Sequence, residues 1–342
     1  MTALSVVMPV HNEAAHLPYT IAALIEALGR AELDAELVLV DDGSADGSAD
    51  IARRVLAERL PVRVVSQPNR GRFEARRVGL EAATGEWVLL LDGRIRLAPT
   101  ALAFVRGRMS AGEQVWTGHV DVESGRNPFG TFWKLLAELA WADYFERPRT
   151  TSFGSEDFDR YPKGTTCFLA PRRLLIDAVR AFRSRYADLR RANDDTPLIR
   201  WIAERERVHV SPSFACTYRP RTTLTAFFRH SLHRGIVFLD GHGRRESRYF
   251  PAVVAFYPIS AALALAALRR PAVVPVAVAL TSTVAAGIGA ARRRSGFEIA
   301  SLGLLAPVYA VAHGIGMWRG LLLDVFNRGE PSPRHRPDSA RR

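Results

Sequence analysis

Residues 6–13 read Val-Val-Met-Pro-Val-His-Asn-Glu, and residues 37–44 read Leu-Val-Leu-Val-Asp-Asp-Gly-Ser. Each segment is a short apolar run that ends abruptly in polar residues, which is typical of a buried parallel strand whose carboxyl end opens into a ligand crevice. Apolar residues between the two runs recur at helical spacing, so a strand, a helix and a second strand with a right-handed crossover are predicted. The unit resembles the opening of a nucleotide-binding α/β sheet, with its chemistry at the polar strand ends.

Several function classes are disfavoured by what the chain lacks. No Gly-x-Gly-x-x-Gly follows the first predicted strand and no Gly-Lys-Ser/Thr follows any strand, so dinucleotide-dependent oxidoreductase and P-loop ATPase chemistry are not expected. Cys167 and Cys216 match neither a metal-ligand spacing nor a disulfide framework, and two reduced, partly buried thiols are predicted. The N-terminus shows no cleaved secretory signal, so the first two-thirds of the chain are expected to stay in the cytoplasm.

The charge of the chain points to anionic partners. Its 342 residues carry a formal net charge of +12, almost wholly from arginine, with lysine only at Lys134 and Lys163. This balance suits phosphate-bearing ligands, an anionic lipid surface or nucleic acid, and charge alone does not choose among them. The spacing of aromatic residues gives no support for nucleic-acid binding, so no nucleic-acid partner is predicted.

The composition changes after about Arg248. Three stretches contain no charged residue, and each is about as long as a helix that crosses a hydrocarbon core: residues 249–268, 271–291 and 299–318. Transmembrane helices, about three, are therefore predicted. Three spans would send the Arg-rich tail to the side opposite a cytoplasmic domain, against the positive-inside tendency, whereas two spans plus a re-entrant or interfacial third segment would keep it inside. The number of spans stays open.

An amphipathic helix is predicted just before the first apolar stretch. Its apolar face would lie in the membrane interface beneath a catalytic domain, or would dock on the core as in an ordinary surface helix. Arg229, His233 and Arg234 fall on other faces. Further on, Gly316 and Gly320 form a Gly-x-x-x-Gly pair that could let the last helix pack closely on another. The apolar face is made of Leu224, Phe227, Phe228, Ser231, Leu232 and Gly235.

Carboxylates at strand ends are the candidate chemical groups. Asp41 and Asp42 close the second strand, where a carboxylate can accept hydrogen bonds from a nucleobase or a ribose, although Asp-Asp-Gly-Ser is also a common turn. Asp92 ends another apolar strand. Between them, an amphipathic helix that begins near Arg72 and carries Arg76 could meet phosphate groups, or its arginines could form a solvated face.

The order of these motifs resembles glycosyltransferase family 2, the inverting enzymes with the GT-A fold. The order is Pro-Val-His-Asn-Glu, Val-Asp-Asp-Gly-Ser, Asn-x-Gly with Ala-Arg, and Gly-Glu-Trp-Val-Leu-Leu-Leu-Asp. The similarity covers about Leu4 to Asp195 and extends loosely through the apolar helices. It implies an α/β fold with a mostly parallel sheet flanked by helices, a nucleoside-diphosphate sugar donor and a role in cell-envelope glycan synthesis.

The resemblance also implies roles for matching positions. Asp195, in the run Asn-Asp-Asp-Thr-Pro-Leu, matches the catalytic base of a Glu-Asp-x-x-Leu signature, and Asp194 lies beside it. Asp92 matches the first carboxylate of an Asp-x-Asp motif, which binds Mg²⁺ or Mn²⁺ bridging the two phosphates. Residues 164–168 are similar to the segment that lines the acceptor side. The residues predicted to bind the nucleotide sugar are Pro9, Glu13, Asp41, Asp42, Arg76, Asp92 and Arg94.

Two departures from the family pattern bear on the prediction. Arg94 stands where the second acid of Asp-x-Asp is usual, so either its guanidinium replaces part of the metal's charge and makes the enzyme less metal-dependent, or the site has lost activity. The predicted interface helix lacks the Gln-x-x-Arg-Trp of processive relatives, which favours transfer of a single sugar. His230 and His233 have no third ligand nearby, so interface-facing imidazoles are expected instead of a metal pair.

The sequence therefore predicts a multi-pass enzyme of the cytoplasmic membrane whose catalytic domain faces the cytoplasm. It would transfer one sugar, with inversion, from a UDP- or GDP-type donor to a lipid-linked or membrane-proximal glycan acceptor, with Asp195 as general base. The alternative is a catalytically silent, sugar-nucleotide-binding membrane protein, motivated by Arg94. The predicted parts are a catalytic domain at 1–221, an interface helix region at 222–248, transmembrane helices at 249–326 and a disordered basic tail at 327–342.

Overall fold

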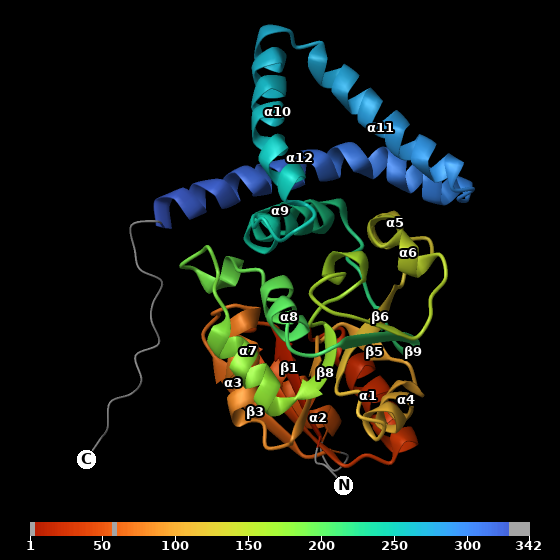
Figure 1. Ribbon diagram of the computed structural model, residues 1–342, viewed down its shortest axis with the longest axis vertical. Coiled ribbons are helices and arrows are strands. Elements are labelled where there is room, and N and C mark those ends of the chain that lie inside the picture. Colours follow the sequence, from red (N-terminus) through yellow and green to blue (C-terminus); the bar gives the residue numbers. More distant parts are fainter. Residues whose placement is uncertain (1–3, 57–59, 328–342) are drawn as a thin grey trace.

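The computed structural model describes residues 4–56 and 60–327. Among these residues, a nine-stranded sheet with helices on both faces forms one end of the molecule, and long helices extend from the other end (Figure 1). The strand order is β3-β2-β1-β4-β8-β6-β9-β5, and β7 pairs with β9. The strands are β1 (Leu4–Val10), β2 (Ala35–Asp42), β3 (Val62–Gln67), β4 (Trp87–Leu91), β5 (Ile95–Leu97), β6 (Val115–Val122), β7 (Thr151–Phe153), β8 (Cys167–Pro171) and β9 (Val208–Tyr218).

The first half of the sheet is parallel and fully covered. β1 lies between β2 and β4, and β3 pairs with the outer side of β2, all in parallel. Every residue of β1 is buried, which explains its continuous apolar run, because helices cover both faces of the sheet. Val6 packs in the core on one face and Val7 in the core on the other. The carboxyl ends of β1, β2 and β4 consequently meet at one edge, where such sheets bind ligands.

The second half of the sheet runs in mixed directions. β8 is antiparallel to both β4 and β6, while β6 is parallel to β9. This places the loop before β8 beside the end of β4, and the backbone N–H of Asp92 donates to the carbonyl of Thr166 at 2.9 Å. The predicted α/β fold is confirmed, with a sheet that is mixed because β5, β7 and β8 are antiparallel to their neighbours.

The helices form two layers on the sheet and a separate group beyond its edge. Two short 3₁₀ helices occur at Phe158–Arg160 and Leu189–Arg191. The α-helices are α1 (Leu17–Ala31), α2 (Ser48–Leu56), α3 (Arg72–Ala82), α4 (Ala101–Met109), α5 (Pro128–Ala140), α6 (Ala142–Phe145), α7 (Arg172–Ala181), α8 (Thr196–Ala203), α9 (Leu224–His242), α10 (Phe250–Arg269), α11 (Val273–Ala291) and α12 (Gly296–Asn327).

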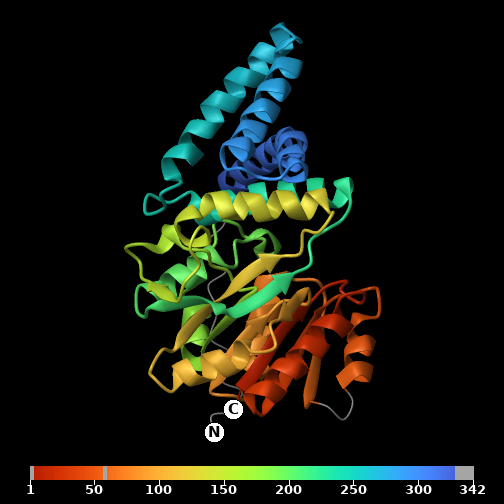
Figure 2. The same ribbon diagram turned by 90° about the vertical axis from the view of Figure 1, so that its right-hand side faces the viewer.

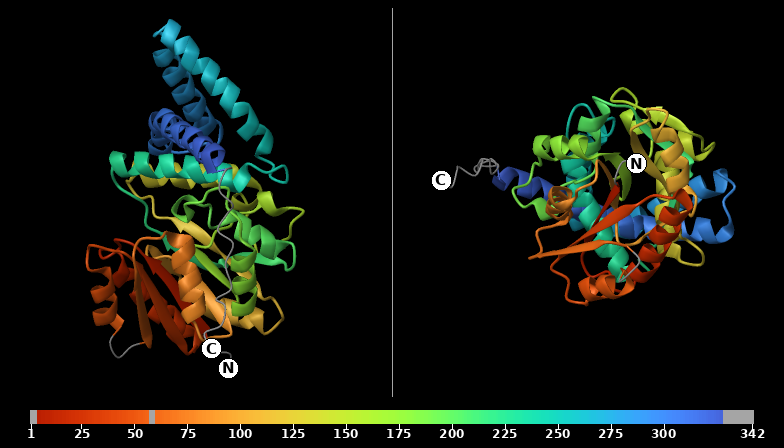
Figure 3. Two further views of the ribbon diagram at one scale, coloured as in Figure 1. Left: turned by 90° about the vertical axis from the view of Figure 1, so that its left-hand side faces the viewer. Right: turned by 90° about the horizontal axis from the view of Figure 1, so that it is seen from below.

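The helices beyond the sheet edge are stacked in order. α5 and α9 lie next to the part of the molecule that contains the sheet, α12 crosses above them, and α10 and α11 project farthest away (Figures 2 and 3). α10, α11 and α12 are each long and apolar enough to cross a membrane. The transmembrane helices predicted from the charge-free stretches are thus present as helices, and the tail predicted to be disordered lies, from residue 328 onward, outside the described residues.

The amphipathic helix predicted before the first apolar stretch is α9, and protein covers part of its apolar face. Phe227 is fully buried and packs against Phe132 and Trp133 of α5, at ring-centroid distances of 5.3 and 5.8 Å. Gly235 contacts the backbone of α12 at His313. His233 and Arg234 of α9 consequently lie on the side of the helix that faces the ends of the strands.

Candidate active site

A pocket of about 300 Å³ opens at the carboxyl ends of β1, β2 and β4, and α9 forms its other wall. The carboxylates of Asp42, Asp92 and Asp195 line this one pocket although they are far apart in sequence. Four more of the predicted site residues line it as well: Pro9, Glu13, Arg94 and Asp194. Asp41 and Arg76 are not among the lining residues. Asp41 instead closes a turn, since its Oδ1 accepts the N–H of Ser44 at 3.0 Å.

Asp42 holds the loop that leads from β3 into α3 at the edge of the pocket. It is 4% exposed, and its Oδ1 accepts from the side-chain amide of Gln67 at 2.7 Å and from the N–H of Arg70 at 2.8 Å. Its Oδ2 accepts from the N–H of Gly71 at 2.8 Å. Gly71 has a φ of 91°, and a Cβ there would lie 2.6 Å from the Cα of Arg190, so only glycine fits. Asp42 therefore shapes the pocket through this loop.

Arg76 gathers the carboxylates on one wall. Its side chain is 3% exposed, its Nη2 donates to Asp92 Oδ1 at 2.8 Å, and its Nη1 lies 3.7 Å from Asp195 Oδ1. Nη1 also donates to Asp194 Oδ2. Three carboxylates so close together would repel one another without a shared cation. Arg76 was predicted to bind the nucleotide sugar, but its guanidinium is buried behind the pocket surface. There it holds Asp92, Asp194 and Asp195 together.

Asp194 and Asp195 are neighbours in different environments at the start of α8. The side chain of Asp194 is 5% exposed and is also paired with Arg72, at 3.2 Å. Burial favours its neutral form, but Arg72 and Arg76 outweigh burial and hold the pKa of Asp194 below its ordinary value. Asp194 is therefore a fixed anion of the pocket wall.

Asp195 is the more accessible of the two acids. Its side chain is 26% exposed, and its Oδ1 accepts from the N–H of Thr165 at 3.1 Å and from the Thr165 hydroxyl. Within residues 4–56 and 60–327, the side-chain hydrogen bonds of Asp195 all go to Oδ1, which leaves Oδ2 without such a partner. The carboxylate is oriented by Thr165 while one oxygen stays available to a ligand.

Glu13 and Arg94 form an ion pair at the pocket wall. The Nε of Arg94 donates to Glu13 Oε1 at 2.7 Å, and the two side chains are about four-fifths buried. Burial raises the pKa of Glu13, and Arg94 opposes that rise. In the described part of the chain, Oε2 of Glu13 is buried and has no hydrogen-bond partner. Such an orphaned acceptor is a place where a ligand N–H or O–H would be stabilised.

The residues present do not by themselves make a metal site. Asp92, the predicted metal ligand, already uses Oδ1 for Arg76 and accepts from the Thr166 hydroxyl at 3.1 Å with Oδ2. A cation, Arg94, stands where a second carboxylate would be needed. Over the described ranges, no three or more His, Cys, Asp or Glu side chains are grouped to hold a metal ion. We therefore derive no catalytic step through a metal.

The wall contributed by α9 carries two histidines and Arg234, and its role as a pocket wall was not predicted. His230 and His233 line the pocket beside Arg234, instead of facing the membrane interface, because the opposite face of α9 packs on α5 and α12. Burial and nearby arginines lower the pKa of His233 to about 4, so its imidazole is neutral at pH 7. Arg221, after β9, also lines the pocket. Neither Arg221 nor Arg234 has a carboxylate within 4.0 Å in the described part of the chain.

The loop that carries the two aspartates is tied to α9. Asp240 is fully buried and accepts from the N–H groups of Arg185 and Asn193, both at 2.7 Å, and from the hydroxyl of Ser184 at 2.9 Å. The side-chain amide of Asn193 donates to the carbonyl of Val237 at 3.2 Å. The position of Asp195 therefore depends on α9, the helix next to the apolar helices, and no local sequence pattern indicates this link.

Comparisons with known proteins agree with the geometry. Residues 5–168 match the sequence model of the family described as Glycosyl transferase family 2. The chain is 34% identical over 190 residues to an undecaprenyl-phosphate 4-deoxy-4-formamido-L-arabinose transferase of Pseudomonas aeruginosa. The aligned region covers 53% of this chain and 50% of that protein. It is also 36% identical over 93 residues to a cholesterol galactosyltransferase of Borreliella burgdorferi, and this aligned region covers 27% of this chain and 26% of that protein.

A solved structure shows the same fold. TarS residues 1–349 of S. aureus superpose with a TM-score of 0.51 and 15% sequence identity, covering 97% of this chain and 92% of that one. The chain spans about half the length of the first curated relative that it matches. Residues 5–168, which contain the motifs at the ends of β1, β2 and β4, are thus similar to glycosyltransferase family 2, as their order predicted.

Proposed function

We propose that the protein is a glycosyltransferase that moves one sugar, with inversion, from a UDP- or GDP-type sugar nucleotide to a lipid-linked acceptor. The observation that carries this proposal is the placement of Asp195, a carboxylate oriented by Thr165 in a pocket lined by arginines. The family of the domain supports the reaction class. The apolar helices beyond α9 support a membrane location, which we propose to be the cytoplasmic face of the cytoplasmic membrane.

Asp195 acts as the general base of this reaction. Thr165 fixes one carboxylate oxygen, and the other accepts the proton of an acceptor hydroxyl as the new bond to the sugar carbon forms. The bond between that carbon and the donor's diphosphate breaks at the same time. Asp194 stays ionised between Arg72 and Arg76 and positions the loop without exchanging protons.

Guanidinium groups receive the negative charge of the donor. Arg221 and Arg234 lack carboxylate partners among the described residues, and Arg94 shares its charge with Glu13. These groups can donate charge-assisted hydrogen bonds to a diphosphate and stabilise it as it leaves. The unpaired Oε2 of Glu13 suits a nucleobase N–H or a ribose hydroxyl. Because Asp92 would be a metal's single protein carboxylate, we expect weak dependence on Mg²⁺ or Mn²⁺.

The acceptor is proposed to be a lipid because the pocket opens beside α9, next to the apolar helices. Two relatives have names that include undecaprenyl phosphate and cholesterol, and we extend to this chain only their common property, a lipid acceptor. A hydroxyl acceptor requires a base, whereas a phosphate acceptor is already an anion and depends on Asp195 less.

The test is to incubate membranes that contain the protein with a panel of labelled UDP- and GDP-sugars, with Mg²⁺, with Mn²⁺ or with EDTA, and to extract the lipids. We expect label in the organic phase that requires the protein and persists in part with EDTA. Membranes with the Asp195→Asn variant serve as the matched control. Binding of a sugar nucleotide without transfer under every metal condition would favour the silent sugar-nucleotide-binding protein instead.

A further inference from the structure

α12 differs from the other two apolar helices in its surroundings. α10 and α11 project away from the catalytic part, and 6% of the apolar window of each is buried. In α12 the corresponding share is 28%. The helix runs crosswise at the level of the lower ends of α10 and α11, next to the layer that contains α9 (Figures 1 and 2). Length and hydropathy alone do not distinguish a helix that projects away from the protein, such as α10 or α11, from one that lies against it, such as α12.

Both ends of α12 are tied to the catalytic side of the molecule. Just before its first turn, Arg294 pairs with Glu138 of α5 at 2.6 Å. Near its last turn, Asp324 pairs with Arg185, at 3.0 Å, in the loop that leads to the catalytic aspartates. The apolar segment Gly296–Phe326 has 31 residues and is about 46 Å long at 1.5 Å per residue. A helix that crossed a bilayer would place one of these two ends on the far side.

The middle of α12 lies directly on α9. A Cβ on Gly316 would come within 2.1 Å of the carbonyl oxygen of Leu232, and a Cβ on Gly235 would come equally close to that of His313. Backbone-to-backbone contact of this kind requires glycine at both positions. The Gly-x-x-x-Gly pair singled out from the sequence therefore joins α12 to the roof of the pocket, not to another membrane span.

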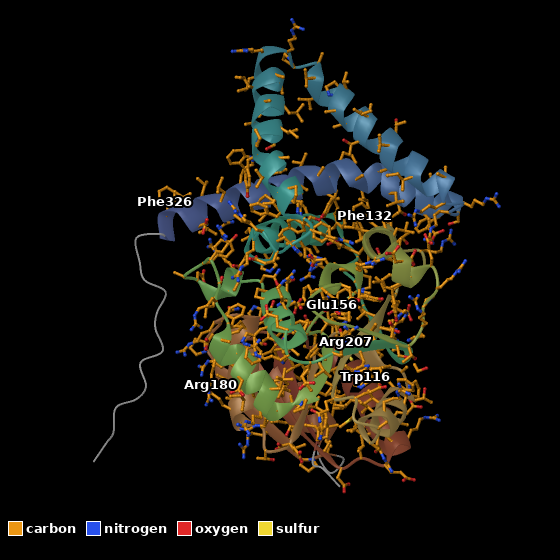
Figure 4. All side chains as sticks on the ribbon, viewed as in Figure 1. Trp116, Phe132, Glu156, Arg180, Arg207 and Phe326 are labelled. Carbon is orange, nitrogen blue, oxygen red and sulfur yellow. The ribbon has the colours of Figure 1, made fainter. Side chains whose placement is uncertain are left out.

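The opposite face of α12 is an exposed apolar stripe. Its large side chains recur at intervals of three, four or seven residues, which places them on one side of the helix. Leu304 is 74% exposed and Phe326 is 79% exposed. Figure 4 shows Phe326 at the outer end of α12, whereas Phe132 lies beneath the helix, where it contacts Tyr309 at 5.3 Å. The stripe is made of Phe297, Leu304, Val311, Ile315, Trp318, Leu322 and Phe326.

We propose that α12 lies in the plane of the membrane and docks the catalytic domain on one leaflet of the bilayer, so that only α10 and α11 span it. The occupant of the apolar stripe is lipid because α12 lies at the foot of α10 and α11, the two exposed apolar helices that project away from the sheet. Because the opposite side of α12 packs on α9 and α5, the stripe is the apolar surface of this helix that is left to contact lipid. Arg292, Arg293 and Arg294, at the turn between α11 and α12, lie on the same side as the catalytic domain.

This arrangement fixes the side of the C-terminus. α10 leaves the catalytic side and α11 returns to it, so a horizontal α12 keeps the Arg-rich C-terminal sequence with the catalytic domain. Only Arg269 and Arg270 would then lie across the bilayer, whereas a spanning α12 would also move the arginines of the tail there. The distribution of charge thus favours the two-span arrangement under the positive-inside tendency.

The first test is the accessibility of single added cysteines in the full-length protein in sealed vesicles of known orientation, with a membrane-impermeant maleimide. Cys167 and Cys216 are each 1% exposed, so the unchanged protein gives the background. We expect Ser339→Cys to react in the same vesicles as Ser110→Cys on the catalytic domain, and Arg270→Cys to react only in the opposite orientation. Reaction of Ser339→Cys together with Arg270→Cys would overturn the proposal.

A second test measures depth, and it does not depend on the tail. Nitroxide labels at Phe297→Cys, Ile315→Cys and Phe326→Cys are expected at one shallow depth, while a label at Leu263→Cys in α10 lies deeper. Ile315 near the bilayer centre, with the two end labels at opposite surfaces, would show that α12 spans. Both readouts are independent of sugar transfer, so failure of the proposed activity leaves this proposal testable.

Discussion

Replacing Arg76 by methionine should destabilise the catalytic domain strongly. Arg76 is 3% exposed and is the shared partner of Asp92, Asp194 and Asp195, so its removal leaves buried carboxylates uncompensated. Breaking one side of a buried pair costs about 3–5 kcal/mol in unfolding free energy. For a domain of about 150–250 residues each kcal/mol shifts Tm by about 2–4 °C, which gives a decrease of roughly 6–20 °C. The decrease in Tm can be measured by thermal unfolding of the detergent-solubilised protein, followed by tryptophan fluorescence.

Arg77→Met is the matched control, one residue further on α3. Arg77 pairs with Glu74 and Glu81 on its own helix, at i,i+3 and i,i+4 spacing, and such pairs within a helix stabilise it by about 0.2–0.5 kcal/mol each. Adding Asp194→Asn to Arg76→Met should restore part of the lost stability, because it removes a carboxylate that the arginine neutralised. Equal Tm values for the Arg76 and Arg77 variants would refute the role assigned to Arg76.

Three further outcomes are expected. Arg94→Ser should raise KM for the sugar nucleotide about tenfold in steady-state assays, from loss of one charged hydrogen bond, and unchanged KM would contradict its role. Thr165→Val should lower kcat about tenfold or more while KM for the donor stays constant, since the hydroxyl orients Asp195; a change in KM alone would argue against orientation. Burial lowers the pKa of His242 to about 4, so the unfolded state binds more protons between pH 6.5 and 4 and stability falls as the pH is lowered through that window. His242→Gln should weaken this dependence of the unfolding free energy on pH, as measured by denaturant titrations at several pH values. An unchanged dependence would show that His242 does not cause it.

Two carboxylates of the pocket wall could be predicted from local sequence patterns. Asp42 and Asp92 each follow a continuous apolar strand, and the ends of parallel strands meet at one edge. Asp195 does not follow such a strand, and its role was predicted only from the resemblance to a family. The role of Arg76 depends on a partner 118 residues away, Asp194, and helical periodicity does not tell a buried guanidinium from a solvated one. The sequence thus indicates that arginines begin α3 without indicating which one is buried.

The apolar end of the molecule was less predictable, since its arrangement depends on which helix covers which. The amphipathic pattern of α9 is real, but α5 and α12 cover the face that includes Phe227, and the histidines turn into the pocket. The hydropathy of α12 is that of a membrane span. Its ion pairs with the loop at Arg185 and with Glu138 are contacts between distant segments, which no local pattern reveals.

The most direct test of the account is the turnover of Asp195→Asn beside Asp188→Asn. Asp188 is a partly buried aspartate that caps a short helix in the same loop, so it controls for loss of a charge nearby. With a hydroxyl acceptor, we expect kcat of Asp195→Asn to fall by about 10²–10⁴-fold, with the affinity for the sugar nucleotide retained and Asp188→Asn close to the unchanged protein. Full turnover in Asp195→Asn would contradict the assignment of this residue as the base.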